Sequence, residues 1–266
     1  MSSKPRPTFP VRLDRGGATP RPQLRSSPPV TPASAPAVPA PMRLPVQSWG
    51  LGADSGAMRK AMVSKLAAMG LQDERVLAAM GAIDRHRFID SALINQAYED
   101  TSLPIGWGQT ISKPGVVARM IELLLQGRSG KPARVLEIGT GCGYQAAVLS
   151  LVATEVYSME RVRGLHEKAR ENMRPLRLPN VHLIFGDGMV GFPSGAPYAG
   201  IIAAAGGEAV PAAWIEQLAV GGRLVAPVVS AKGAKQALVV IDKTAQGVRQ
   251  SVLEAVHFVP LKSGIA

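Results

Sequence analysis

Residues 134–144 read Arg-Val-Leu-Glu-Ile-Gly-Thr-Gly-Cys-Gly-Tyr, and this stretch decides the fold. A short apolar run carries Glu137 and then breaks into three alternating glycines, Gly139, Gly141 and Gly143, before a helix-like segment begins. A strand, a glycine turn and a helix start together form the entry to a nucleotide-type binding site. Glycines suit this turn because a side chain would hold the ligand away from the backbone. The stretch therefore predicts an open α/β sheet with a ligand at its edge.

What the glycine turn lacks narrows the choice of ligand. No Lys-Ser or Lys-Thr pair follows the last glycine, so a triphosphate cradle is not expected. The dinucleotide spacing G-x-G-x-x-G also fails, because Tyr144 stands where its third glycine would be. A compact turn with an acid just upstream suits S-adenosylmethionine, which carries no phosphate. The alternatives are an NAD-dependent oxidoreductase on a similar sheet and a plain tight turn without a ligand.

Segments with the character of strands and helices alternate after residue 133. Such alternation argues for a parallel sheet covered on both faces, so we predict a Rossmann-like, doubly wound, mostly parallel α/β sheet. Two late runs have no helix between them and are expected to pair as an antiparallel edge. The predicted strands are 135–138, 155–159, 181–185, 201–204, 223–227, 237–242 and 248–259, and the helices are 144–152, 162–173 and 211–218.

The segment before the sheet is predicted to be a helical subdomain. Apolar residues recur at helical spacing over 55–81, with a break at Gly70, and a second short helix is expected near Asp84. Residues 101–114 show no period, and their glycines and prolines predict an ordered loop. Proline suits the first turn of a helix, so a further helix is expected over 114–124.

The first 48 residues differ in composition from the rest of the chain. They hold 12 of the 22 prolines and seven Arg or Lys residues against the single acid Asp14. Such a segment cannot bury enough apolar surface to offset its ordering entropy, so we predict a disordered Pro/Arg-rich leader over 1–48. The formal net charge of +11 divides into +6 for this leader and +5 for the predicted domain over 49–266. Because that domain is only mildly basic, nucleic-acid binding is not expected.

Several other classes of protein are also not expected. No run reaches the roughly 18 apolar residues of a membrane span. The N-terminus lacks the charged-then-apolar order of a secretory signal. The lone cysteine, Cys142, cannot form an internal disulfide, and it is expected to be a small residue that fills a tight turn. The four histidines have no metal-ligand spacing, so no metal is expected. We therefore expect a cytoplasmic protein, and we also expect it to be a monomer.

Three acids fall where the first three predicted strands end: Glu137, Glu160 and Asp187. Ligands of open parallel sheets bind outside the carboxyl ends of the strands. A carboxylate after the second strand can accept hydrogen bonds from both hydroxyls of a ribose, and one after the third can accept from an adenine amino group. Each could also be a solvated strand-end acid, and Glu137 could merely brace the glycine turn.

With these residues assembled, the chain resembles the protein-L-isoaspartate O-methyltransferases of the bacterial type, within the class I S-adenosylmethionine-dependent methyltransferase superfamily. The likeness runs from about Ser55 to the C-terminus. The glycine turn is shared by many methyltransferases, whereas the loop Leu-Pro-Ile-Gly-Trp-Gly-Gln-Thr-Ile-Ser-Lys-Pro at 103–114 is far more particular. Further matches are Gly-Asp-Gly at 186–188, Gly-Gly-Arg-Leu-Val-Ala-Pro at 221–227 and Glu-Ala-Val-His-Phe-Val-Pro-Leu at 254–261.

The resemblance implies methyl transfer from S-adenosylmethionine to the free α-carboxylate of L-isoaspartyl residues in damaged proteins and peptides, which begins repair through a succinimide. A carboxylate is already an ionised nucleophile near neutral pH, and the sulfonium is an activated methyl donor. Catalysis is therefore expected to come from alignment and the exclusion of water.

By the same resemblance Ser112 is the active-site serine, although it could instead cap the helix that follows. Trp107 is expected either to wall the substrate channel or to pack under the loop. The predicted cofactor-binding residues are Thr110, Ile111, Glu137, Gly139, Gly141, Gly143, Glu160, Asp187 and Gly188.

Five positions depart from the family's pattern: Lys113, Gly115, Ala199, Ala204 and Gly207. The family usually has an acid where Ala199 stands, Thr or Ser where Ala204 stands, and a proline near Gly207. All five are expected to border the substrate cleft. Two further alternatives are a non-catalytic protein that binds nucleic acid through its leader and a methyltransferase with another acceptor, such as RNA.

Overall fold

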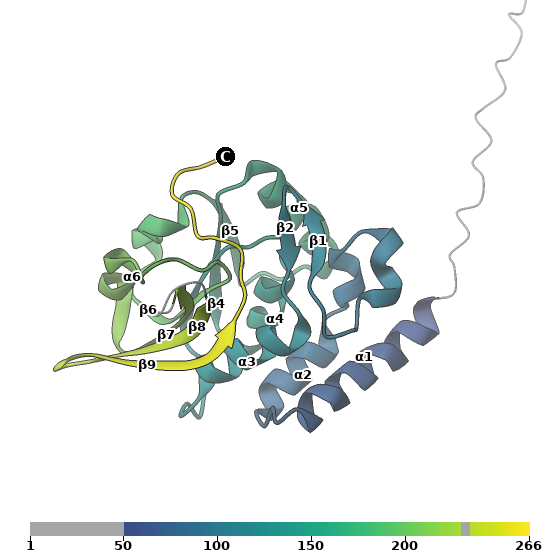
Figure 1. Ribbon diagram of the computed structural model, residues 1–266, viewed down its shortest axis with the longest axis horizontal. Coiled ribbons are helices and arrows are strands. Elements are labelled where there is room, and N and C mark those ends of the chain that lie inside the picture. The colour runs from purple at the N-terminus through teal and green to yellow at the C-terminus, as the bar shows by residue number, and fades with distance from the viewer. Residues whose placement is uncertain (1–50, 230–234) are drawn as a thin grey trace, which may run out of the picture. The chain divides into compact units, whose positions relative to one another are not determined.

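Seven strands form the central sheet of the domain (Figure 1). The computed structural model describes residues 51–229 and 235–266 of the chain. The leader predicted over 1–48 and the first residues of the predicted domain lie outside this described part. The strands of the sheet are β3 (Arg134–Ile138), β4 (Glu155–Glu160), β5 (Val181–Phe185), β6 (Tyr198–Ala203), β7 (Leu218–Val229), β8 (Gln236–Thr244) and β9 (Gly247–Val256).

The sheet is doubly wound about β3. The strand order is β5-β4-β3-β6-β7-β8-β9, and every neighbouring pair up to β7 is parallel. The last two strands, β8 and β9, run antiparallel to their neighbours, as predicted for the late runs. The chain builds outward from β3 first to β4 and β5 and then, in the other direction, to β6 and β7. In such sheets the crevice at this reversal takes the ligand.

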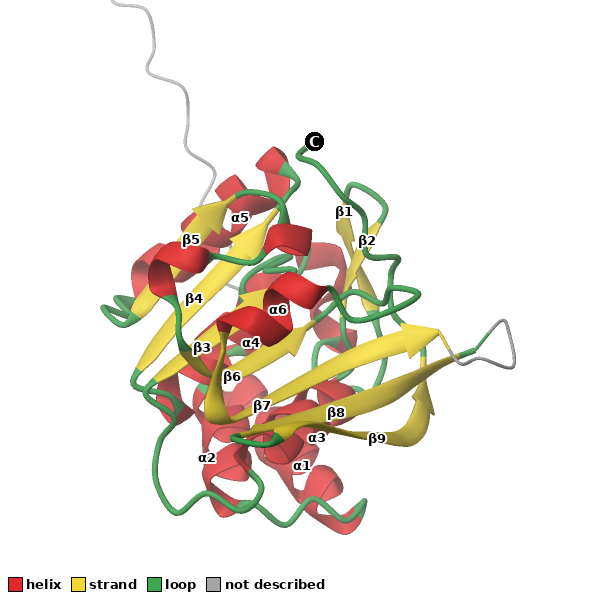
Figure 2. Ribbon diagram, turned by 90° about the vertical axis from the view of Figure 1, so that its left-hand side faces the viewer, coloured by secondary structure: helices red, strands yellow, loops and turns green. Residues whose placement is uncertain are grey.

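Helices cover both faces of the sheet, which confirms the predicted α/β class. One face packs against α3 (Pro114–Leu125), α4 (Tyr144–Val152) and α5 (Arg163–Met173), and the other carries α6 (Ala212–Gln217). Figure 2 shows α6 in front of the sheet and α3 behind it. Because both faces are covered, four of the five residues of β3 are buried, three of them apolar and the fourth Glu137.

The N-terminal helical subdomain contains α1 (Leu51–Ala68) and α2 (Glu74–Ala82), as predicted. Asp73 caps α2, because its carboxylate accepts hydrogen bonds from two backbone N–H groups of the first turn. The short helix expected near Asp84 is a 3₁₀ helix, Arg85–Phe88. Tyr144 joins this subdomain to the sheet, since its ring lies edge-on to Phe88 and beneath the guanidinium of Arg85. Tyr144, which stands where the dinucleotide pattern would have its third glycine, is therefore a buried core residue.

The ordered loop predicted over residues 101–114 contains two short strands that the sequence did not indicate. The segment forms an antiparallel hairpin of β1 (Leu103–Gly106) and β2 (Gln109–Ile111), with Trp107 and Gly108 at its tip. Alternate residues of β1 are buried, but a strand of four residues that contains a proline and a glycine is too short to show this pattern in the sequence.

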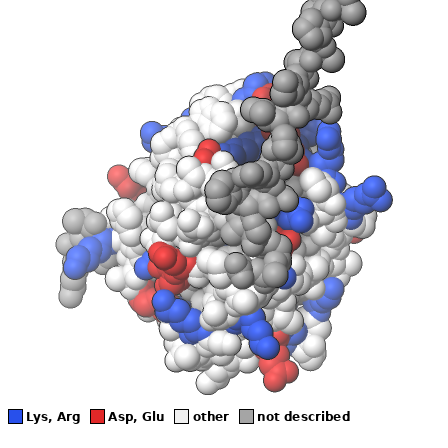
Figure 3. Space-filling view, turned by 90° about the vertical axis from the view of Figure 1, so that its right-hand side faces the viewer, with Lys and Arg blue, Asp and Glu red and all other residues white. Residues whose placement is uncertain are grey.

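The surface of the described domain does not gather its positive charge into one patch on the face shown in Figure 3. Lys and Arg side chains are scattered there among Asp and Glu side chains. Among the helices of residues 51–229 and 235–266, none combines the length and the apolar character that a membrane span requires.

Candidate active site

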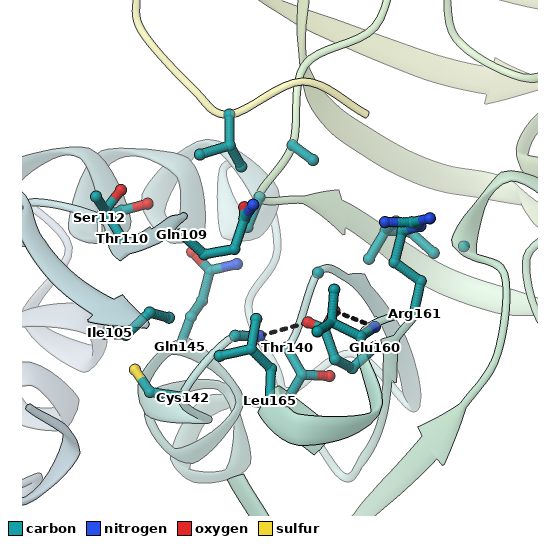
Figure 4. A pocket seen from close by; sticks show the side chains of 18 of the residues that line it. Ile105, Gln109, Thr110, Ser112, Thr140, Cys142, Gln145, Glu160, Arg161 and Leu165 are labelled. Atoms are coloured by element: carbon teal, nitrogen blue, oxygen red, sulfur yellow. Dashed lines mark hydrogen bonds between the residues drawn. The ribbon is translucent and has the colours of Figure 1, made fainter. Parts of the chain in front are cut away.

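A cavity of about 350 Å³ lies outside the carboxyl ends of β3 and β4 (Figure 4). Segments far apart in the sequence line it: the hairpin, the glycine turn, the start of α4, the end of β4 and residues 259–262. Of the predicted site residues, seven line this cavity: Thr110, Ile111, Ser112, Gly139, Gly141, Glu160 and Gly188. The other three, Glu137, Gly143 and Asp187, lie around it without lining it.

The glycine turn bends tightly under the cavity. Gly139 and Gly141 both have positive φ angles, +91° and +57°, a conformation that residues with side chains rarely adopt. Gly143 is the N-cap residue of α4 and does not line the cavity. A Cβ atom at Gly143 would lie 2.8 Å from the sulfur of Met173, so this glycine permits close packing of α4 against α5.

Glu160 connects the end of β4 to the glycine turn. Its Oε2 accepts a hydrogen bond of 2.8 Å from the N–H of Gly141, and its Oε1 accepts one of 2.9 Å from Val162. Burial raises the pKa of this carboxyl, which is only 5% exposed. Each carboxylate oxygen can accept two hydrogen bonds, so both retain capacity for a ligand in the cavity.

Glu137 is fully buried beneath the glycine turn. The hydroxyl of Ser158 donates a short hydrogen bond to its Oε2, and Ser158 in turn pairs with the Thr140 hydroxyl at 2.6 Å. Burial raises the pKa of Glu137 to about 8. These contacts favour the alternative in which Glu137 braces the turn.

The raised pKa of Glu137 makes the stability of the ligand-free protein dependent on pH. Between pH 4.5 and about 8 the native state keeps a proton that the unfolded chain has lost, so stability falls as pH rises through this window. We expect Glu137→Gln to flatten this decline, with most of the gain at pH 8. Urea unfolding of both proteins at pH 5 and pH 8 measures the difference; an equal slope in the two proteins would contradict the assignment.

Asp187 faces a segment from the end of the described chain. Its Oδ1 accepts from the N–H of Met189 at 2.8 Å, and its Oδ2 accepts from Gly264 at 2.6 Å. The same segment is held by Arg161, whose Nε donates to the Gly264 carbonyl at 2.7 Å. In Figure 1 this yellow segment runs from β9 back over the carboxyl ends of the strands. It lacks any periodicity, and the only sequence signal for it is the match over 254–261.

Ser112 follows β2 and lies on the cavity wall. Lys113 occupies the N-cap position of α3, with no side-chain hydrogen bond to the helix. The N–H of Gly115, in the first turn, is instead bound by Asp100 Oδ1 at 2.6 Å. Within the described residues no hydrogen bond joins the Ser112 hydroxyl to α3, so the helix-cap alternative is wrong. The hydroxyl is free to serve the cavity.

Trp107 holds the tip of the hairpin over α5. Its φ of +50° lies in the left-handed region, and its indole covers Gly164 so closely that a Cβ there would clash with the ring. Lys168 strengthens this contact by donating to the Ile105 carbonyl at 2.9 Å. Trp107 also lines the cavity and is 57% exposed, so it both walls the cavity and packs onto the domain.

Comparison with known proteins agrees with this geometry. Residues 57–266 match the model of the family described as protein-L-isoaspartate(D-aspartate) O-methyltransferase (PCMT). A protein-L-isoaspartate O-methyltransferase from Methylibium petroleiphilum is 55% identical over 271 residues, which cover 98% of this chain and 97% of that protein. The chain belongs to this family.

Two solved structures share the fold of this family member. A protein-L-isoaspartate O-methyltransferase is 30% identical, with a TM-score of 0.70, over 77% of this chain and 66% of the other. A structure from Plasmodium falciparum, described as an enzyme of the same family in complex with S-adenosyl-L-homocysteine, is 26% identical with a TM-score of 0.66. That alignment covers 77% of this chain and 98% of the other.

Family membership makes the chain an S-adenosylmethionine-dependent methyltransferase, and the residues of the cavity fit that cofactor. Glycines allow close approach to the backbone, and the Glu160 carboxylate retains acceptor capacity for hydroxyl groups. Among the described residues, no group of three or more His, Cys, Asp or Glu side chains could hold a metal ion.

Sequence reasoning did not single out all of the lining residues of this methyltransferase. Gln145, Thr140 and Arg161 also line the cavity. The expectation that all five departures border the cleft is wrong, since only Ala204 does so. Lys113 and Gly115 line a separate hollow beside α1 and β9, while Ala199 and Gly207 line neither space.

Proposed function

We propose that this chain transfers the methyl group of S-adenosylmethionine to the free α-carboxylate of L-isoaspartyl residues in damaged proteins and peptides. The observation that carries the proposal is the single cavity shared by Glu160, the glycine turn and the Gln109–Ser112 stretch. The same cavity is thus lined by the residues proposed to bind adenosine and by the hairpin residues that carry the family resemblance. The methyl ester that results starts repair through a succinimide.

The proposed cofactor site extends from the end of β4 to the hairpin. Glu160 accepts hydrogen bonds from the ribose hydroxyls, while Gly139 and Gly141 let the ligand lie against the backbone. Gly188, Thr110 and Ile111 complete its walls. Three residues support it from outside. Glu137 braces the turn, Gly143 is the N-cap of α4, and Asp187 anchors the segment at Gly264.

The proposed reaction needs little acid–base chemistry from the protein. The bound cofactor supplies an activated methyl group on a sulfonium. Ser112 donates a hydrogen bond to one oxygen of the acceptor carboxylate and leaves the other oxygen free to attack. The hydroxyl is neutral, so it orients the carboxylate without pairing its charge. Trp107, held over α5, limits the access of water to the reacting groups.

The protein is proposed to act on its substrates as a monomer in the cytoplasm, without a nucleic-acid partner. The presence of a single, buried cysteine supports a reducing compartment. The mixed charge on the face in Figure 3 gives no support to a nucleic-acid site there.

A peptide assay tests the proposed function. The protein should transfer labelled methyl groups from S-adenosylmethionine to a peptide that contains L-isoaspartate, and hardly at all to the same peptide with normal aspartate. The reason is that only the isoaspartyl peptide presents a free α-carboxylate at that position. Equal labelling of the two peptides, or labelling of neither, would refute the proposed substrate. An RNA acceptor arm in the same assay should remain unlabelled.

A further inference from the structure

Two buried polar atoms beneath the cavity have no hydrogen-bond partner among the described residues: Oε1 of Glu137 and Nε2 of Gln145. Glu137 is fully buried, whereas Gln145 lines the cavity and is 7% exposed. Such unpaired groups cost free energy comparable to a lost hydrogen bond, so an arrangement that satisfies both is favoured. Gln145 is thus a buried polar side chain at the cavity wall whose Nε2 the described residues leave unpaired.

The two orphan atoms are complementary. The Gln145 amide lies close enough to Glu137 to oppose the rise of that carboxyl's pKa, although no hydrogen bond of normal geometry joins them. Donation from Nε2 to Glu137 Oε1 would satisfy both atoms. The carbonyl oxygen of Gln145 then becomes the atom presented to the cavity. An amide oxygen is a suitable acceptor for the N–H groups of a cationic donor.

Gln145 also lies at the end of the cavity away from Glu160, where a cationic group of the ligand could reach it. Figure 4 shows Gln145 and Glu160 on opposite sides of Thr140. Under the proposed function Glu160 binds the ribose, so the methionine half of the cofactor extends toward Gln145. That half ends in an α-ammonium and an α-carboxylate, and the ammonium matches the acceptor described above.

We propose that Gln145 binds the α-ammonium group of the methyl donor through its side-chain carbonyl, while Glu137 holds its amide nitrogen. This inference rests on the proposed function, because it requires that S-adenosylmethionine occupy the cavity. Ser158, which donates to the other oxygen of Glu137, fixes the carboxyl from the opposite side. Glu137 thereby acts as a positioning residue although it does not line the cavity.

Binding of three ligands to Gln145→Leu tests this proposal by calorimetry, with no acceptor peptide present. S-adenosylhomocysteine carries both charged groups, its decarboxylated analogue keeps only the amine, and 5′-methylthioadenosine has neither. We expect the variant to bind the first two about 10- to 100-fold more weakly, by the same factor, since each loses one hydrogen bond to a charged group. Its affinity for 5′-methylthioadenosine should be unchanged, which also shows that the variant is folded.

Glu160→Gln is the matched control. All three ligands contain the ribose, so loss of the Glu160 carboxylate should weaken the binding of all three. An unchanged affinity of Gln145→Leu for the amine analogue, with weaker binding of S-adenosylhomocysteine, would show that the amide binds the carboxylate and would overturn the proposal. Equal weakening of all three ligands, or of none, would also overturn it. Failure of peptide methylation alone would refute the proposed acceptor and leave this inference standing, since no acceptor enters the binding test.

Discussion

Ser112→Ala is expected to lower kcat on an isoaspartyl peptide by about 10- to 100-fold, the loss of one hydrogen bond to a charged group. The hydroxyl lies on the cavity wall and makes no hydrogen bond to α3, so the helix should lose nothing. Affinity for S-adenosylhomocysteine and the melting temperature should therefore stay close to those of the unsubstituted protein. Steady-state kinetics, calorimetry and thermal unfolding measure the three quantities.

Ser150→Ala is the matched control for this variant. Ser150 is a buried serine of α4 outside the cavity, and its hydroxyl donates to the Ala147 carbonyl at 2.6 Å. Its removal should affect stability alone and leave turnover unchanged. If Ser112→Ala retained full turnover, the proposed contact between this hydroxyl and the acceptor carboxylate would be wrong.

Glu160→Ala is expected to weaken the binding of S-adenosylhomocysteine by about 100-fold or more, an effect of about 3 kcal/mol or more. The substitution removes the acceptor proposed for the ribose, and it leaves the N–H groups of Gly141 and Val162 without their present partner. The glycine turn loses its connection to β4 as well, so the melting temperature should also fall. Calorimetric titration gives the affinity directly.

Glu155→Ala separates this effect from a general effect of removing an acid from β4. Glu155 lies at the other end of the same strand, where it pairs with the exposed His182. Its loss should leave cofactor affinity unchanged. Were Glu160→Ala to bind the cofactor as well as the unsubstituted protein, Glu160 would be merely a brace for the turn.

The sequence predicts the parallel half of the sheet because its signals there are local. Over 134–152 the glycines themselves mark where the strand ends and the helix begins. The apolar residues over 181–185 likewise predict β5 with the bounds that it has, Val181–Phe185. The hairpin over 103–111 escapes prediction because strands of four and three residues give too few positions for a period to show. Local sequence patterns therefore predict the cofactor side of the cavity, formed by the glycine turn, better than the proposed acceptor side, formed by the hairpin.

The details of the site depend on contacts that no local pattern contains. Asp187 is a reasonable candidate for the adenine amino group, yet its carboxylate binds the N–H of Gly264, 77 residues later in the chain. Among the described residues, Oε1 of Glu137 and Nε2 of Gln145 are left without partners by the packing of α4 on β3, which residue spacing does not reveal. Gly115 illustrates the same point, since a Cβ there would lie 2.9 Å from an oxygen of Asp100. Its departure from the family pattern is thus explained by a tertiary contact.

The most direct test of the central claim is a crystal structure of the protein with S-adenosylhomocysteine and an isoaspartyl peptide. We predict that the ribose hydroxyls bind Glu160 and that the peptide's α-carboxylate lies between the Ser112 hydroxyl and the ligand's sulfur. A ligand bound outside this cavity, or a carboxylate remote from Ser112 with the ligand in place, would contradict the account.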